Sequence, residues 1–365
     1  MEKSMIQRLK RTQLLLLLAA AVLLFFGGCG GAEPEVRGLE PESIRAGLEE
    51  GGGETALEGT SEGESGGEVL SLPVSAEKST VDYQGESFLC SFRVIGGDGI
   101  WLTGYEGELS GDALSQGKLF CGRIAIGENQ MQKFSLDMPE NAFALRGCVD
   151  SSGRCHILFT EKTDNIVTYE RLEIWVLNAR GEREQLIDLT AFPEADSLKQ
   201  SWRWMAADIE GNYYLANESR VLAINTDSES IAEYCPESGS VEGIGIGKSE
   251  TVYGVFAGGE ERYLARISFD GKAPERCADL TAKGTQPSFT VLQPGVETEL
   301  LLANQGEGLW SYDGEEIKLE VPLESIVGNG QDILGMGFLA DGRCCVMSRE
   351  DGSYRFYYVP VEGRE

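Results

Sequence analysis

Residues 208–225 read Asp-Ile-Glu-Gly-Asn-Tyr-Tyr-Leu-Ala-Asn-Glu-Ser-Arg-Val-Leu-Ala-Ile-Asn. The stretch contains two short apolar runs, and a turn rich in Asp, Asn, Gly or Ser precedes each of them. Apolar runs of about four residues between such turns are typical of strands joined as hairpins and are too short for helices. The stretch therefore predicts one antiparallel strand pair.

The same pattern recurs along residues 69–365. One series of turns lies at Asn129, Gly181, Ser228, Gly271, Gly314 and Gly363, with spacings of 43 to 52 residues. A second series lies part of a period earlier and includes the turns that begin at Asp98, Asp150, Asp208 and Asp341. No long 3.6-residue period appears, so we expect few helices. Each unit thus contains two hairpin turns and has room for four strands.

Repeated units of this length with four strands are typical of β-propeller blades. The sequence predicts an all-β propeller over residues 69–365, with six blades favoured and seven as the alternative count. The last unit, from Ile333, has only three strands, and residues 69–74 are predicted to supply the fourth and close the ring. A pair of β-sandwich domains with chance periodicity is the alternative architecture.

The turn at residues 208–215, Asp-x-x-Gly-Asn-Tyr-Tyr-Leu, resembles the turns of NHL and TolB-like propellers. The repeats also resemble the propeller regions of Gram-positive lipoproteins that precede an ABC-type solute-binding domain. The resemblance covers residues 69–365. It implies a propeller fold and, by kinship alone, an accessory role in ABC solute uptake.

The N-terminal segment has the order of a secretory signal. Four basic residues in the first eleven precede the apolar run Leu14–Phe26, and Gly27-Gly28-Cys29 follows. Thirteen apolar residues in a helix are too short to cross a bilayer core of about 30 Å. Phe26-Gly-Gly-Cys29 resembles the lipobox of bacterial lipoproteins, which implies cleavage after residue 28 and lipid on Cys29. We therefore predict a signal peptide at 1–28 and a lipid anchor on the extracytoplasmic face of the cell membrane.

Residues 29–68 are predicted to form a disordered tether that begins with the lipidated cysteine. From Gly30 to Glu68 the chain has eleven Gly, eleven Glu and only two basic residues. Such a segment cannot bury enough apolar surface to offset the entropy of ordering it, and its like charges repel one another. The tether would hold the folded domain clear of the membrane surface.

The charge balance of the chain is strongly acidic. Its formal net charge is −29, and removal of residues 1–28, with four basic residues and one acidic residue, brings it to −32. Such a surface repels phosphate backbones, so nucleic acid is not expected as a partner. Solubility of a secreted protein is the favoured explanation of the charge, over specific cation binding.

The sequence indicates no catalytic or metal-binding group and no cofactor. His156 is the single histidine, and no nucleophile-elbow sequence or Cys-x-x-C motif accompanies it. We therefore interpret His156 as an ordinary strand residue. The turn aspartates are explained by hydrogen bonds to their own backbone in preference to calcium ligation.

Two local features are candidate sites. If residues 150–153 form a hairpin turn, Cys148 lies opposite Cys155 within disulfide range. Trp202, Arg203 and Trp204 form the most unusual run, and the two indoles are predicted to share one face of a strand. Flat aromatic rings stack on sugars or cations, although packing between blades is the favoured explanation of these two.

Three functions fit these observations. The first is a non-enzymatic, surface-tethered propeller that binds a glycan, a peptide or another envelope protein through one end of its ring. The second is a glycan-active hydrolase or lyase with paired Asp and Glu residues in the central funnel. The third is an accessory component of an ABC solute-uptake system.

Overall fold

The computed structural model describes the chain from β1 to the last strand with short gaps. The described residues are 77–81, 88–106, 118–128, 130–134, 136–139, 141–163, 166–236, 239–258, 261–280, 289–304, 307–326, 333–350 and 353–361. The predicted signal peptide, the lipidated Cys29 and the tether lie outside these residues. Within them, no helix is both long and apolar enough to cross a membrane.

The described residues form six four-stranded antiparallel sheets. The first contains β2 (Phe88–Gly96), β3 (Gly99–Glu106), β4 (Lys118–Ala125) and β5 (Gln132–Phe134). The second contains β6 (Ala142–Val149), β7 (Cys155–Thr163), β8 (Ile166–Leu177) and β9 (Arg183–Asp188). The third contains β10 (Trp204–Ala207), β11 (Tyr213–Asn217), β12 (Arg220–Asn225) and β13 (Ser230–Tyr234).

The other three sheets follow the same order. The fourth contains β14 (Ser240–Ile246), β15 (Val252–Gly258), β16 (Glu261–Arg266) and β17 (Glu275–Asp279). The fifth contains β18 (Phe289–Gln293), β19 (Leu300–Asn304), β20 (Gly308–Tyr312) and β21 (Ile317–Pro322). The sixth contains β22 (Ile333–Phe338), β23 (Arg343–Glu350), β24 (Ser353–Pro360) and β1 (Glu77–Val81). Single 3-10 turns lie at η1 (Ala195–Leu198) and η2 (Leu323–Ser325).

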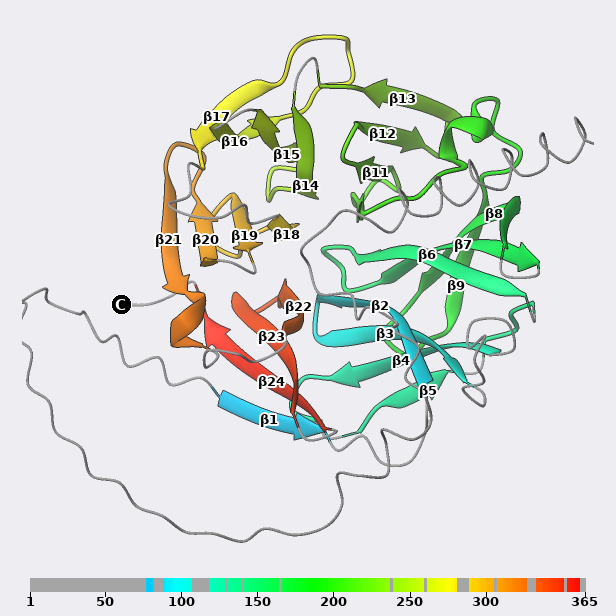
Figure 1. Cartoon of the computed structure of the whole chain (residues 1–365), viewed down its shortest axis with the longest axis horizontal. Helices are drawn as coiled ribbons and strands as arrows, with labels where there is room; N and C mark the ends of the chain where they lie inside the picture. The colour runs from blue at the N-terminus through cyan, green and yellow to red at the C-terminus, as the bar shows by residue number, and fades with distance from the viewer. Residues whose placement is uncertain are drawn as a thin grey trace, which may run out of the picture. The chain divides into compact units, whose positions relative to one another are not determined.

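The six sheets are the blades of a propeller (Figure 1). The first strand of each blade is the innermost, and each of these strands contacts the innermost strand of the next blade all the way round, β22 with β2 included. The prediction of an all-β, six-bladed propeller is confirmed.

The ring is closed by pairing between the two ends of the domain. β1 pairs antiparallel with β24, with Lys78 opposite Tyr357, and becomes the outer strand of the sixth blade. The sequence predicted this arrangement but placed the strand too early, because the strand that pairs is Glu77–Val81 and not 69–74. Residues 69–74 lie outside the described part of the chain.

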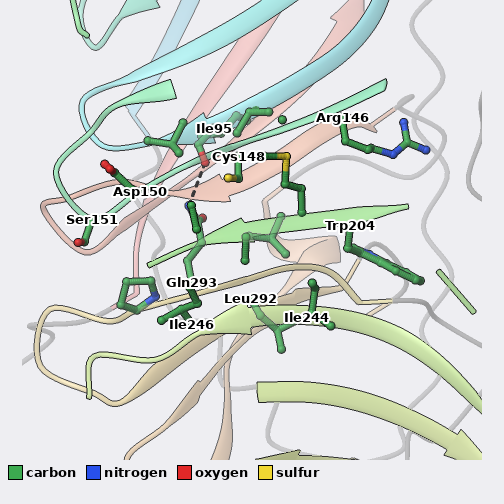
Figure 2. Close-up of a pocket in the computed structure, with 18 of the residues that line it drawn as sticks. Ile95, Arg146, Cys148, Asp150, Ser151, Trp204, Ile244, Ile246, Leu292 and Gln293 are labelled. Atoms are coloured by element: carbon green, nitrogen blue, oxygen red, sulfur yellow. Dashed lines mark hydrogen bonds between the residues drawn. The ribbon is translucent and has the colours of Figure 1, made fainter. Parts of the chain in front are cut away.

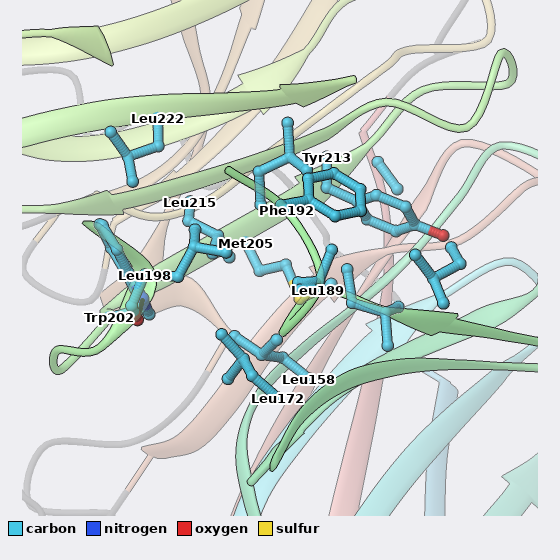
Figure 3. Close-up of a cluster of buried hydrophobic side chains, with 14 of the residues drawn as sticks. Leu158, Leu172, Leu189, Phe192, Leu198, Trp202, Met205, Tyr213, Leu215 and Leu222 are labelled. Atoms are coloured by element: carbon cyan, nitrogen blue, oxygen red, sulfur yellow. Dashed lines mark hydrogen bonds between the residues drawn. The ribbon is translucent and has the colours of Figure 1, made fainter. Parts of the chain in front are cut away.

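The buried apolar side chains of the described residues form six clusters, one between each pair of adjacent blades. The largest joins the second and third blades and includes Leu158, Trp202 and Leu215 (Figure 3). The second strand of a blade lies between two neighbouring blades, so β19 is buried along its whole length. Strands that are buried on both faces have continuous apolar sequences. Strands with one solvated face have alternating apolar and polar residues.

The innermost strands approach one another closely at glycines. A Cβ atom added to Gly245 would lie 2.2 Å from the carbonyl oxygen of Leu292 in the next blade. A Cβ added to Gly337 would lie 2.5 Å from the Cβ of Ile95. The absence of side chains at these two positions lets neighbouring blades pack tightly around the axis.

Candidate functional site

The innermost strands of all six blades surround one cavity on the axis of the ring. This axial cavity has a volume of about 230 Å³. Its walls include Val94, Gly147, Trp204, Ile244, Leu292 and Met336, one residue from each innermost strand. A ligand in the axial cavity could contact every blade at once, which makes it the candidate site of the described part of the protein.

The wall of the cavity is irregular because the innermost strands contain bulges. β2, β6, β14, β18 and β22 each show one shift of register against the second strand of their blade. In β6 the shift lies between Ala144 and Arg146, and in β22 it lies between Ile333 and Gly335. A bulge bends the strand and redirects the side chain that follows it.

The two ends of the cavity differ in chemistry. Arg146 and Trp204 lie at one end, whereas Asp150 and Ser151 lie at the other (Figure 2). Arg146 belongs to β6 and Asp150 follows that strand directly, so the direction of the strand separates the two groups. The cavity therefore has an arginine end and a carboxylate end.

The carboxylate of Asp150 is fully engaged within its own blade. Oδ1 accepts hydrogen bonds from Ser152 N at 3.0 Å, from Ser152 Oγ at 2.7 Å and from Arg154 N at 2.9 Å. Oδ2 accepts from Arg154 Nε at 2.8 Å and contacts His156 Nε2 at 3.0 Å. Burial acts to raise the pKa of Asp150, but the hydrogen bonds from His156 and Ser152 outweigh it and hold that pKa well below its ordinary value.

His156 lies in β7 and is buried between the second and third blades. It is 2% exposed, and its Nδ1 lies 3.0 Å from the hydroxyl of Tyr213 in the third blade. With Nε2 on Asp150 and Nδ1 on Tyr213, both ring nitrogens have partners, so the imidazole joins two blades. Burial raises the pKa of Tyr213, which keeps its hydroxyl protonated.

A second turn repeats this arrangement in the third blade. Asp208 accepts hydrogen bonds from Asn212 N at 2.8 Å, Asn212 Nδ2 at 2.7 Å and the hydroxyl of Tyr214 at 3.1 Å. These bonds confirm that Asp150 and Asp208 stabilise their own turns. Glu250, which lines the carboxylate end, has a raised pKa because it is partly buried and lies near Asp208.

The structure separates Trp202 from the other two residues of the predicted aromatic site. Trp202 is 1% exposed in the cluster between the second and third blades, and its Nε1 donates to Leu198 O at 3.0 Å. Trp204 packs toward the fourth blade and lines the axial cavity, as does Arg203, which pairs with Glu218 at 2.8 Å. The indoles therefore do not share a face, because Trp202 precedes β10 and only Trp204 lies in it.

The prediction that Cys148 lies directly opposite Cys155 is wrong. Cys148 lies opposite His156, and Cys155 lies opposite Val149, so the two cysteines point to opposite faces of the blade. Both are free and buried, in different clusters. The prediction assumed an even number of residues in the turn, whereas Asp150 N bonds to Arg154 O around a loop of three. A shift of one residue exchanges the faces of a strand.

Arg93 and Arg146, which line the cavity, were not identified from the sequence. Each is a charged residue inside an otherwise apolar run, Phe92-Arg-Val-Ile95 and Ala144-Leu-Arg-Gly-Cys148. A charged residue within the apolar innermost strand of a blade is the sequence signal that could have identified them as cavity residues. Within the described ranges, no group of three or more His, Cys, Asp or Glu residues is placed to hold a metal ion.

No protein-family model and no curated protein matches the chain. Among solved structures, it is similar to a catalytically inactive virginiamycin B lyase from Staphylococcus aureus with quinupristin, at 12% identity and a TM-score of 0.44 over 78% of this chain and 99% of that one. It is also similar to YCF48 from Cyanidioschyzon merolae, at 12% identity and a TM-score of 0.46 over 77% and 98% of the two chains. Similarity at this level says nothing about what the present chain binds or catalyses.

Proposed function

We propose that this protein is a lipoprotein, anchored through Cys29 to the extracytoplasmic face of the cell membrane, that binds a ligand in the axial cavity of its propeller. The observation that carries the proposal is the cavity itself, whose walls come from all six blades. The ligand is a glycan, a peptide or a segment of another envelope protein, presented to the cavity from one end of the ring. The tether of residues 29–68 gives the propeller reach from the membrane.

Binding is favoured over glycan hydrolysis by the state of the carboxylates at the cavity. A retaining glycosidase needs two carboxyl groups about 5–5.5 Å apart that are able to exchange protons or attack the sugar. Asp150 lines the cavity, but five hydrogen bonds and its complete burial withdraw it from such a role. Asp150 and Glu250 therefore do not form the catalytic carboxylate pair that glycan hydrolysis would need.

The proposal is tested by screening the full-length chain, purified in detergent, against glycan and peptide arrays. We expect at least one ligand that Trp204→Ala no longer binds and that Leu319→Ala still binds. Trp204 lines the cavity, whereas Leu319 is 38% exposed on the outer strand β21. Far-UV circular dichroism checks that both variants are folded. Ligands that bind both variants equally would show that the site lies outside the cavity and would contradict the proposal.

A further inference from the structure

Two arginines of the axial cavity each donate a hydrogen bond to the carbonyl of a bulge residue. Arg93 Nη1 donates to Leu334 O at 3.4 Å, and Arg146 Nη1 donates to Leu145 O at 3.3 Å. Leu334 and Leu145 are the extra residues of the bulges in β22 and β6. The repeat of the blades makes these two positions equivalent, so both guanidinium groups lie at the level of the bulges, at the arginine end.

These guanidinium groups are partly withdrawn from water. Arg93 and Arg146 are both half-buried, and Arg93 Nε is buried with no hydrogen-bond partner among the described residues. A buried donor without a partner costs about 1–3 kcal/mol, unless water or a ligand satisfies it. An acceptor that enters the cavity would therefore recover a hydrogen bond that the protein alone leaves unmade.

Trp204 supplies an apolar surface at the same end of the cavity. Its ring is half-buried, and the guanidinium carbon of Arg203 lies 6.0 Å from the ring centroid. Arg203 also pairs with Glu218 at 2.8 Å, so its charge is compensated within the protein. Further apolar residues of the cavity wall include Met205, Ile244 and Met336.

We propose that the arginine end binds the carboxylate of a small organic anion, whose apolar or aromatic body lies along Trp204 and the apolar wall. Arg93 and Arg146 contact the carboxylate, because a planar guanidinium matches its two oxygens. The inference rests on the proposed function, since it assigns a ligand class to the same cavity. The net charge of −29 disfavours the binding of anions to the surface as a whole. The two arginines would make the cavity a local exception that attracts a carboxylate.

Three probes test the inference on the full-length chain in detergent, with binding followed by saturation-transfer NMR and calorimetry. Phenylacetate carries a carboxylate and a ring, phenylacetamide is its uncharged analogue, and inorganic phosphate is an anion without an apolar body. We expect phenylacetate to bind more tightly than either of the other two. Arg93→Gln and Arg146→Gln are each expected to weaken phenylacetate about tenfold or more, because hydrogen bonds to charged groups are lost.

The control variant is Arg180→Gln. The Arg180 side chain is 80% exposed and pairs with Glu182 at 3.5 Å, outside the cavity. Phenylacetate affinity should be unchanged in this variant, which excludes a general effect of lost positive charge. Thermal melting of all three variants checks that they fold.

Each remaining outcome overturns the inference. Equal binding of phenylacetamide, lost in Trp204→Ala, would refute the anionic ligand and leave a ligand site in the cavity standing. Tight binding of phosphate that displaces phenylacetate would refute the apolar body. If no probe binds at concentrations near 10 mM, where weak fragments are normally detected, the ligand class is wrong, while the array screen still decides the proposed function.

Discussion

The side-chain amide of Gln293 donates a hydrogen bond to the backbone carbonyl of Ile95 at 3.2 Å, which links the fifth blade to the first (Figure 2). The oxygen of the same amide accepts from Phe338 N of the sixth blade at 2.7 Å. One side chain in the axial cavity thus joins three blades. The contact bypasses the sheet ladders, so it stabilises the ring and not a single blade.

Gln293→Leu is expected to lower the free energy of unfolding by about 2 kcal/mol. The substitution keeps the volume but leaves Ile95 O and Phe338 N without their side-chain partners. Urea denaturation of the variant measures the loss. Gln185→Leu, at an exposed position of β9, is the matched control and should change stability little. Equal stability of the two variants would contradict the bridging role.

Asp150 is expected to make the stability of the protein sensitive to acid. Its pKa is depressed in the folded state, so its contribution to stability is present above the ordinary pKa of aspartate, near 4, and is lost as the pH falls below it. Asp150→Asn is expected to cost about 3 kcal/mol at pH 7, because the carboxylate is buried beside His156 and Arg154. The same variant should lose less stability than the wild type between pH 5 and pH 3.

The measurement is urea denaturation of both proteins across that pH range. Asp227→Asn is the control, since Asp227 lies exposed in the turn between β12 and β13 and should matter little at any pH in the series. A variant at Asp150 with the pH profile of the wild type would show that another carboxylate controls the acid transition.

Closure of the ring predicts a sharp difference between two truncations. Removal of residues 1–81 deletes β1 and leaves β24 as an open edge, with a loss of about 5–10 °C in melting temperature and a tendency to aggregate. Removal of residues 1–68 keeps β1 and should leave the melting temperature unchanged. Differential scanning calorimetry and light scattering compare the two. Similar behaviour of both truncations would show that β1 does not close the ring.

The buried cysteines should resist modification. Burial raises the pKa of Cys121 to about 12 and also raises that of Cys148, so little thiolate forms at neutral pH. Cys235 is exposed and should react with a thiol reagent much faster. Mass spectrometry after brief labelling identifies the modified residues, with and without prior reductant. Increased labelling of Cys148 and Cys155 after reduction would show that these two cysteines form a disulfide, contrary to the strand register.

Lipid attachment at Cys29 remains a prediction, and metabolic labelling with an alkyne fatty acid tests it. The wild type should incorporate label and sediment with membranes, whereas Cys29→Ser should do neither. Cys235→Ser, which removes an exposed thiol of the propeller, should behave as the wild type. Label that persists in Cys29→Ser would exclude this cysteine as the anchor.

Turn motifs and apolar runs are sufficient to predict the architecture. They are not sufficient for details that depend on the exact number of residues in a turn. The turn at Asp208 and its relatives at Asp150 and Asp341 revealed the period, because an aspartate that bonds its own turn acts within a few residues. The register beyond a turn depends on the number of residues in it. That number was misjudged at residues 150–154, and Cys148 and Cys155 were paired in error.

The amino-acid sequence by itself determined the all-β class, the six repeated units and the sharing of the last blade between the chain ends, because turns and apolar runs are short-range signals. Only the tertiary structure decided which side chains meet at the axis. Arg93, Arg146, Trp204 and Gln293 come from four different blades and meet there through strand bulges and close contacts between blades. Such meetings arise from packing between distant segments, whose geometry no local pattern specifies.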